Sequence, residues 1–252
     1  MSGIRTEVSS GVMTIVLNRP EKKNAITNAM YGEIADALNH AASDPSVGAV
    51  LLRGEGADFC SGNDIGMFAE ASAGTVDIHE SNTGTFLTAI TTFPKPLVAA
   101  VTGRAIGVGV TMLFHCDLVY VAHDCQLRTP FIDLALVPEA ASAYTIPARI
   151  GHVTAFALFA LGDPIGADEA VALGIANRAV PAAEVAGIAA AAAKALAAKP
   201  LSALIATKRL MRDAEAIAAA IDAESQAFAD QLKTPEAAAA FAAFAARKAP
   251  RA

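Results

Sequence analysis

The sequence predicts an α/β protein with a mixed core of strands and helices and a helical C-terminal region. Up to Pro181, short apolar runs rich in β-branched residues alternate with stretches of helical periodicity. Beyond Pro181 the chain is rich in alanine and has no strand signal. With 252 residues, 54% of them hydrophobic, the chain can bury a full core. We therefore divide it into a core, residues 1–195, and a helical region, residues 196–252.

Apolar runs bounded by glycine, proline and polar turns define the expected strands. These cover residues 12–17, 47–53, 97–101, 118–121, 126–129 and 175–180.

Six helices are expected in the core, and one of them starts over the apolar residues 108–114. The first runs over 27–42, with Thr27 as its N-cap and one apolar face, and the second contains Phe86 and Ile90. The others cover 141–149, 153–161 and 167–173, and Pro147 should end or kink the first of these three. In the C-terminal region we expect helices over 183–199, 201–231 and 235–247, whose small alanine side chains favour close packing or a partner subunit.

Charge and composition exclude several classes of protein. A formal net charge of −6 argues against nucleic acids and anionic membrane surfaces as partners. No apolar run reaches the ~20 residues of a membrane span, and the N-terminus lacks the apolar core of a signal peptide. Three cysteines without metal-ligand spacing predict reduced thiols in the cytoplasm and no metal site; Cys60 is expected to be a buried filler.

Two glycine-containing loops, each placed after a strand, are the candidates for chemistry. One is F-C-S-G-N-D-I, residues 59–65, and the other is G-R-A-I-G-V-G-V-T-M-L-F-H-C-D, residues 103–117. A glycine turn leading into a helix presents free backbone N–H groups, which suit a phosphate or an oxyanion formed during a reaction. A Rossmann-type phosphate turn is the weaker alternative, because no third glycine has the required spacing and no early βαβ unit frames the loop.

Several collinear motifs resemble the crotonase (enoyl-CoA hydratase/isomerase) superfamily. F-C-S-G-N-D-I is similar to the family's F-x-x-G-x-D, and K-P-L-V-A-A-V-T-G-R-A-I-G-V-G-V to its K-P-x-x-A-x-x-x-G-x-A-x-G-x-G. L-N-R-P-E-K-K-N-A and L-G-D-P-I-G-A-D-E-A-V-A-L-G-I-A-N match two further blocks, in the right order from about residue 12 to residue 181. The resemblance implies a spiral of ββα units with a C-terminal helical trimerisation region. It also implies an acyl-CoA substrate, no separate cofactor, and a homotrimer or hexamer.

The same resemblance assigns roles to individual residues. The two oxyanion-hole donors are the backbone N–H groups of Asn63 and Val108. For the CoA moiety the candidates are Lys22, Lys23 and Arg19, whose charges lie near the end of the first strand, together with Ala25; a solvated loop charge is the alternative for each cation. The residues that the resemblance places around the acyl group are Ser61, Gly62, Ile65, Gly107, Thr111, Phe131 and Leu136.

The expected reaction depends on which carboxylates are present. Hydratases of this family use two glutamates, and the matching positions here are Thr111 and Phe131, neither of which moves protons as a carboxylate does. Glu139 stands instead in P-E-A-A-S-A-Y-T-I-P, which resembles the P-E-x-x-S-x-x-x-x-P stretch of peroxisomal-type 3-enoyl-CoA to 2-enoyl-CoA isomerases. In those enzymes this glutamate is the single base. An apolar surrounding that includes Phe131, Leu136 and Val108 should raise its pKa.

Alternatives remain open at this stage. Glu139 in the first turn of a helix could simply interact with the helix dipole in solvent. The chain could be a hydratase, another crotonase-type enzyme using Glu139 or Asp133, or a non-catalytic acyl-CoA-binding protein.

The remaining polar residues are assigned smaller roles. Asp64 is expected to brace its loop and Thr111 to bond a carbonyl within its helix, whereas Lys208 and Arg209 are weak phosphate candidates. Three histidines without triad or metal spacing are expected to be structural: His115, His123 and His152.

Overall fold

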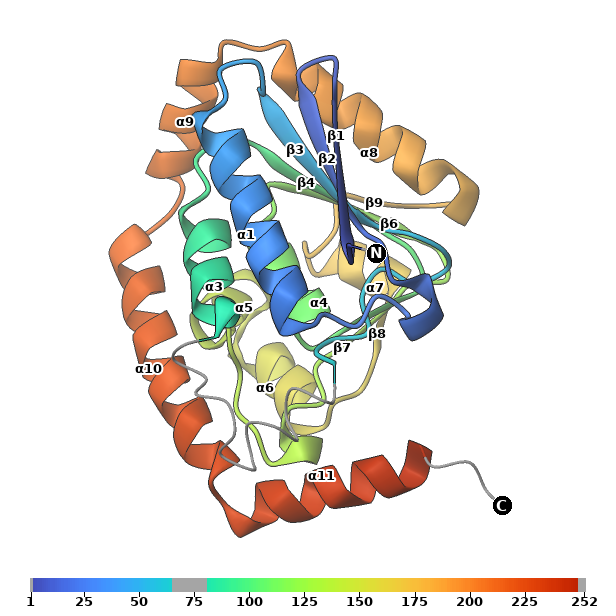
Figure 1. Ribbon diagram of the computed structural model, residues 1–252, viewed down its shortest axis with the longest axis vertical. Coiled ribbons are helices and arrows are strands. Elements are labelled where there is room, and N and C mark those ends of the chain that lie inside the picture. Colours follow the sequence, from blue (N-terminus) through green and yellow to red (C-terminus); the bar gives the residue numbers. More distant parts are fainter. Residues whose placement is uncertain (1, 65–80, 249–252) are drawn as a thin grey trace.

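The computed structural model describes residues 2–64 and 81–248, and its centre is a six-stranded sheet (Figure 1). The strand order is β1-β2-β3-β4-β6-β9, with β1 antiparallel to β2 and every later pair parallel. The strands are β1 (Ile4–Ser9), β2 (Val12–Leu17), β3 (Ala49–Gly54), β4 (Leu97–Val101), β6 (Leu118–Ala122) and β9 (Arg178–Val180).

Side chains that alternate along these strands enter two different cores. Val50 and Leu52 of β3 belong to the larger core together with the apolar face of α1 (Asn28–Ser43) and with α3 (Asn82–Thr92). Ala49 and Leu51 point to the opposite face and pack with Val185, Ala189 and Ala193 of α8 (Ala182–Ala197). Strands buried on both faces read as continuous apolar runs, which is why the sequence located them well.

A second sheet of three short strands lies at the end of the first and carries the two glycine loops. It consists of β5 (Arg104–Ile106), β7 (Gln126–Arg128) and β8 (Ile165–Gly166), in the order β5-β7-β8. β5 was not expected: the strand that leads into the helix at Val108 is β5 and not β4. That helix, α4 (Val108–Thr111), is a single turn that continues as the 3-10 helix η3 (Met112–His115).

The helices that complete the core are mostly where the sequence predicted them. They are α5 (Ser142–Ile150), α6 (His152–Ala160) and α7 (Ala167–Ala172), with 3-10 turns η1 (Pro20–Lys22) and η4 (Ile132–Leu134). The Thr27 side chain caps α1 by accepting from the Met30 N–H (3.3 Å). Pro147 does not end α5, which continues to Ile150, so of the two expected effects the helix end was wrong and the kink stays a prediction.

The C-terminal region folds back over the core. The helix expected over 201–231 is two helices, α9 (Leu201–Leu210) and α10 (Ala214–Leu232), separated at Met211–Asp213. α10 packs against α5 and α3, and α11 (Pro235–Lys248) packs against η4 (Figure 1). The division at residue 195 falls in the last turn of α8 and stays a prediction.

No single helix of the described residues is long and apolar enough to cross a membrane. Only α8 and α9 taken together reach that length and composition, and they are bent by 106° at their junction.

Candidate active site

The two glycine loops lie against each other. Residues 59–62 run beside β5, where the Cys60 N–H donates to the Arg104 carbonyl (3.0 Å) and the Ile106 N–H donates to the Cys60 carbonyl (2.9 Å). A Cβ atom on Gly109 would lie 2.8 Å from the Cys60 carbonyl oxygen, closer than real contacts allow. Glycine at this position is therefore what lets the loop and α4 approach so closely.

In this arrangement two backbone N–H groups, those of Asn63 and Val108, have no hydrogen-bond acceptor within the described part of the chain. Val108 is the first residue of α4, and Gly107 before it has φ +55°, a conformation that favours glycine. Asn63 follows Gly62, whose φ is +89°. Both N–H groups therefore remain available to a ligand.

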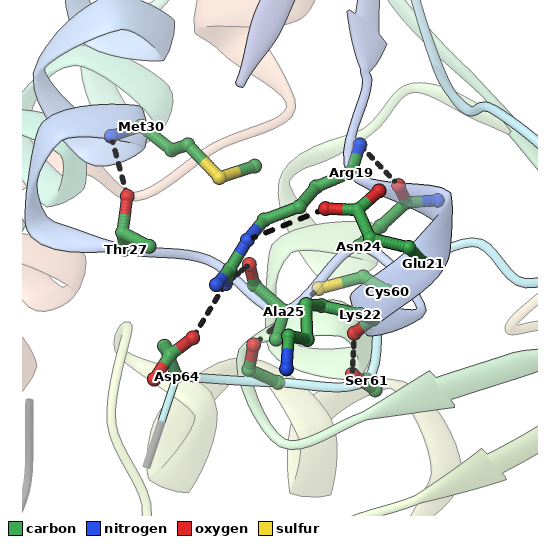
Figure 2. Close-up of polar contacts among 11 residues, drawn as sticks. Arg19, Glu21, Lys22, Asn24, Ala25, Thr27, Met30, Cys60, Ser61 and Asp64 are labelled. Carbon is green, nitrogen blue, oxygen red and sulfur yellow. Dashed lines mark hydrogen bonds and ion pairs between the residues drawn. The ribbon is translucent and has the colours of Figure 1, made fainter. Parts of the chain in front are cut away.

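The loop that carries Asn63 is braced from both sides. The Tyr31 hydroxyl of α1 donates to the Asn63 side-chain oxygen. The Arg19 guanidinium bridges the Ala25 carbonyl (3.1 Å) and the Asp64 carboxylate (2.5 Å), as Figure 2 shows. Asp64 thus has the bracing contact that the sequence suggested, and Arg19 is engaged by it.

Glu139 lies beside the second loop. Its carboxylate accepts a hydrogen bond from the Thr111 hydroxyl at 2.6 Å, so the base candidate is attached to the helix that begins at Val108. Glu139 precedes α5 by three residues, outside the first turn where the helix-dipole explanation placed it. Burial is the largest cause that raises the pKa of Glu139 to about 7, opposed by the Thr111 hydrogen bond and supported by the charge of Glu224. The direction is the one expected from the sequence.

This pKa makes a prediction about stability. A carboxyl whose pKa is 4.5 in the unfolded chain and about 7 in the fold contributes stability below pH 4.5, which is lost as pH rises towards 7. Glu139→Gln removes this loss. At ~1.36 kcal/mol per pH unit, a pKa that rises from 4.5 to about 7 on folding corresponds to ~3 kcal/mol at pH 8. We expect the Tm of the variant to exceed that of the wild type at pH 8 by roughly 6–12 °C, and at pH 5 by about a quarter of that. Differential scanning calorimetry measures both differences. Equal Tm values at pH 8 would contradict the assigned pKa.

The residues expected around the acyl group are mostly buried. Phe131, Leu136 and Val108 belong to the larger apolar core, which also contains Ala140, the neighbour of Glu139. The Phe131 ring packs on Phe159 with centroids 6.1 Å apart. Thr111 is buried as well, whereas Ser61 and Gly107 are half-buried. Ile65 lies outside the described residues.

The CoA candidates lie at the end of η1 and on the loop that follows it. Lys22 and Lys23 are exposed, and Ala25 is half-buried. The Lys22 carbonyl accepts from the Ser61 hydroxyl (3.2 Å) and the Lys23 carbonyl accepts from the Ser61 N–H (2.9 Å), so both lysines adjoin the first glycine loop (Figure 2).

Two of the weaker expectations need correction. Lys208 is buried and donates to the Lys95 carbonyl (2.9 Å) and the Asp117 carboxylate (2.8 Å), so it is no phosphate ligand. Asp133, the alternative acid/base, lies in η4, where it is exposed and pairs with Arg128 at 3.1 Å.

The remaining weak expectations concern histidine, cysteine and Thr111. His115 is buried between two hydrogen-bond partners, as a structural histidine should be. Cys60 is buried with a free thiol. The Thr111 hydroxyl reaches the Val108 carbonyl of its own helix only at 3.5 Å, since its main partner is Glu139.

Sequence reasoning missed three buried polar side chains, of which two, Tyr31 and Glu224, support the site and one, Lys95, holds the end of α1. Tyr31 occupies a core position of α1 one turn before Ile34, and a buried tyrosine hydroxyl needs a partner, which could have drawn attention to it. Lys95 is buried at the end of α1 and donates to the carbonyls of Ala41, Asp44 and Val47 at 2.7–2.8 Å. Nothing in the sequence around Glu224 of α10 predicts that this side chain is buried or that it contacts the site.

No group of three or more metal-ligating side chains occurs among the described residues. The expectation of no metal and no separate cofactor stays a prediction.

Comparison with known proteins decides the family. The sequence model of the enoyl-CoA hydratase/isomerase family matches residues 7–251, nearly the whole chain. The chain belongs to this family. It is therefore an enzyme of the crotonase superfamily, with the crotonase-like α/β fold that the motifs implied.

Individual relatives carry both names of the family. An enoyl-CoA delta isomerase 2 of Rattus norvegicus is 39% identical over 184 residues, which cover 71% of this chain and 46% of that protein. A probable enoyl-CoA hydratase of Rhodobacter capsulatus is 34% identical over 178 residues, covering 71% and 68%. The structure of OdaA from Pseudomonas aeruginosa matches with a TM-score of 0.91 at 40% identity, covering 97% of this chain and 99% of that one.

The chain spans about half the length of the rat and human isomerase relatives that it matches. Since isomerases and hydratases both occur among the relatives, the choice of reaction rests on the site residues.

Proposed function

We propose that this crotonase-superfamily enzyme converts 3-enoyl-CoA to 2-enoyl-CoA, with Glu139 as its single acid/base. The observation that carries this proposal is the 2.6 Å hydrogen bond between Thr111 on α4 and the Glu139 carboxylate. This bond holds the carboxyl beside α4, whose first N–H, that of Val108, is free. Proton transfer next to a thioester needs both a base and an N–H donor to the thioester oxygen.

The reaction balances without a further reactant. The thioester oxygen accepts from the N–H groups of Asn63 and Val108, and Glu139 removes a proton from the α carbon. The electron pair of the broken C–H bond spreads through the double bond to the thioester oxygen, giving a dienolate that the two N–H groups stabilise. Glu139 then returns its proton to the γ carbon, and the double bond is conjugated with the carbonyl.

The chemistry of Glu139 suits this role. With a pKa near 7, the carboxyl is substantially ionised at neutral pH and still holds a proton well enough to return it. We propose that the buried Phe131 and Leu136 line the acyl pocket and keep competing water away from the dienolate.

Hydration is the second candidate, favoured by the hydratase names among the relatives. It requires one group to activate water and another to deliver a proton. The positions of the hydratase glutamates hold Thr111 and Phe131, and Asp133 is exposed and paired with Arg128. These facts favour isomerisation over hydration. A non-catalytic acyl-CoA-binding protein is the third candidate, and absence of turnover in the assay below would identify it.

Substrate binding and assembly follow the same proposal. Lys22, Lys23 and Ala25 are proposed to contact the CoA moiety, because this loop adjoins Asn63 and its two ammonium groups are free to meet phosphates. A homotrimer or hexamer is supported by the exposed Leu210 and Met211 at the end of α9, and sedimentation would measure the oligomeric state.

Three buried free thiols fit a reducing compartment such as the cytoplasm, which fractionation of the source cells would check.

The deciding assay supplies 3-enoyl-CoA and 2-enoyl-CoA separately. We expect the ultraviolet absorbance of the conjugated thioester to appear from the first substrate, with hydration of the second at least ~100-fold slower, in line with the effect of one acid/base group. The rate of the first reaction should rise with pH through about 7, as Glu139 ionises. Hydration faster than isomerisation would overturn the proposal, and tight binding without turnover of either substrate would indicate the binding protein.

A further inference from the structure

The turn that carries Glu139 is strained. Ala140 and Ala141, the next two residues, have φ +62° and +55°. Left-handed backbone costs a non-glycine residue about 1–2 kcal/mol, and two such residues in succession persist only where neighbouring groups hold them. The position of Glu139 therefore depends on whatever holds this turn.

One support comes from Glu224, a carboxylate in the middle of α10. Only 7% of Glu224 is exposed, which is unusual for a glutamate without a cationic partner. Its Oε1 accepts from the Ala143 N–H at 2.6 Å, and the nearby Ala141 N–H opposes the rise that burial causes in the pKa of the carboxyl. Glu224 thus satisfies an N–H group at the start of α5 that the helix itself cannot satisfy.

A second support comes from His115 of η3, which the C-terminal region contacts in turn. The His115 Nε2–H donates to the Ala140 carbonyl (2.7 Å), and the Arg212 guanidinium donates to His115 Nδ1 (2.9 Å). Burial lowers the pKa of His115 to about 3, which keeps the ring neutral and consistent with one donor and one acceptor nitrogen. Arg212 lies just before α10, so the C-terminal region reaches the turn directly through Glu224 and indirectly through Arg212 and His115.

We propose that Glu224 is a positioning residue for Glu139, through which the C-terminal region holds the strained turn 139–141 in its reactive geometry. The carboxyl is not used as a structural ion pair: its Oε2 is buried and has no hydrogen-bond partner among the described residues, and the same is true of the Ser142 hydroxyl. A neutral acceptor of the same shape should serve the Ala143 N–H equally well. This inference rests on the proposed role of Glu139 as the base.

The test compares three single variants of the full chain. Glu224→Ala removes the acceptor, Glu224→Gln keeps Oε1, and Glu215→Ala makes the same truncation at an exposed position of the same helix. We expect Glu224→Ala to lower kcat for 3-enoyl-CoA by about 10–100-fold with KM within about 3-fold, because small displacements of a reacting group have effects of this size. Glu224→Gln should stay within about 3-fold of the wild type, and Glu215→Ala should not differ from it.

Hydrogen exchange of the free protein gives a readout that needs no turnover. The amides of Ala141 and Ala143 should exchange faster in Glu224→Ala than in the wild type and Glu215→Ala. If Glu224→Ala does not fold, Glu224→Asp retracts the acceptor by one methylene and should show both effects to a smaller extent.

The outcomes separate the two proposals. A wild type without isomerase activity would defeat the proposed function and leave the exchange data to judge the role of Glu224. Isomerase activity with unchanged kcat and exchange in Glu224→Ala would overturn the positioning role. A Glu224→Gln variant as impaired as Glu224→Ala would overturn the claim that the carboxyl acts as a hydrogen-bond acceptor.

Discussion

Glu139→Gln is expected to lower kcat for the isomerisation of 3-enoyl-CoA by about 10³–10⁴-fold, towards the upper end of the range for general acid/base groups. A large loss is expected because the same group takes the proton from the α carbon and returns it to the γ carbon. The described residues offer no second carboxyl in hydrogen-bond contact with Thr111. KM should change little, since the oxyanion donors and the apolar lining are untouched.

Glutamine removes the titratable carboxyl and keeps the shape of the side chain. Its amide oxygen can still accept from the Thr111 hydroxyl, so the turn keeps its contact with α4. Glu184→Gln, the same change on the exposed first turn of α8, is the matched control and should keep full activity. Steady-state rates from the absorbance of the conjugated product measure all three proteins. A Glu139→Gln variant that retains a tenth of the wild-type kcat would exclude Glu139 as the base.

Val108→Pro is expected to lower kcat by about 10²–10³-fold, the effect of losing one oxyanion-hole donor. Val108 is the first residue of α4, the helix position that tolerates proline best, and its N–H donates to no protein oxygen in the described chain. Gly107, which would precede the proline, has no Cβ to clash with the ring. The variant should therefore fold with a Tm near that of the wild type.

The control is Val108→Ala, which keeps the N–H and loses two buried methyl groups. It should be the less stable of the two variants and the more active one, because large-to-small changes in a core reduce stability. General damage to the site would make the less stable variant also the less active one. Lower activity in the more stable variant, Val108→Pro, would therefore point to the lost N–H. If Val108→Pro folds and keeps wild-type kcat, the Val108 N–H does not bind the developing oxyanion.

Much of the fold could be predicted because its signals are local. Leu97–Val101 is apolar at every position, since the central strand is covered on both faces, and its bounds matched the prediction. β1 was missed because most of its side chains are exposed and give no apolar run. β5 was missed because three residues between two glycines look like part of a turn.

The sequence by itself determined the family and the candidates: the glycines of residues 62 and 107, the absence of both hydratase glutamates, and the presence of Glu139. These are statements about residue types at fixed spacings within one stretch of chain. Only the tertiary structure decided which side chains meet, because such contacts join residues far apart in sequence. Thr111 meets Glu139 across 28 positions, and Glu224 meets Ala143 across 81. A carboxyl's pKa and a strained turn depend on such neighbours, so the environment of Glu139 could be read only from the folded chain.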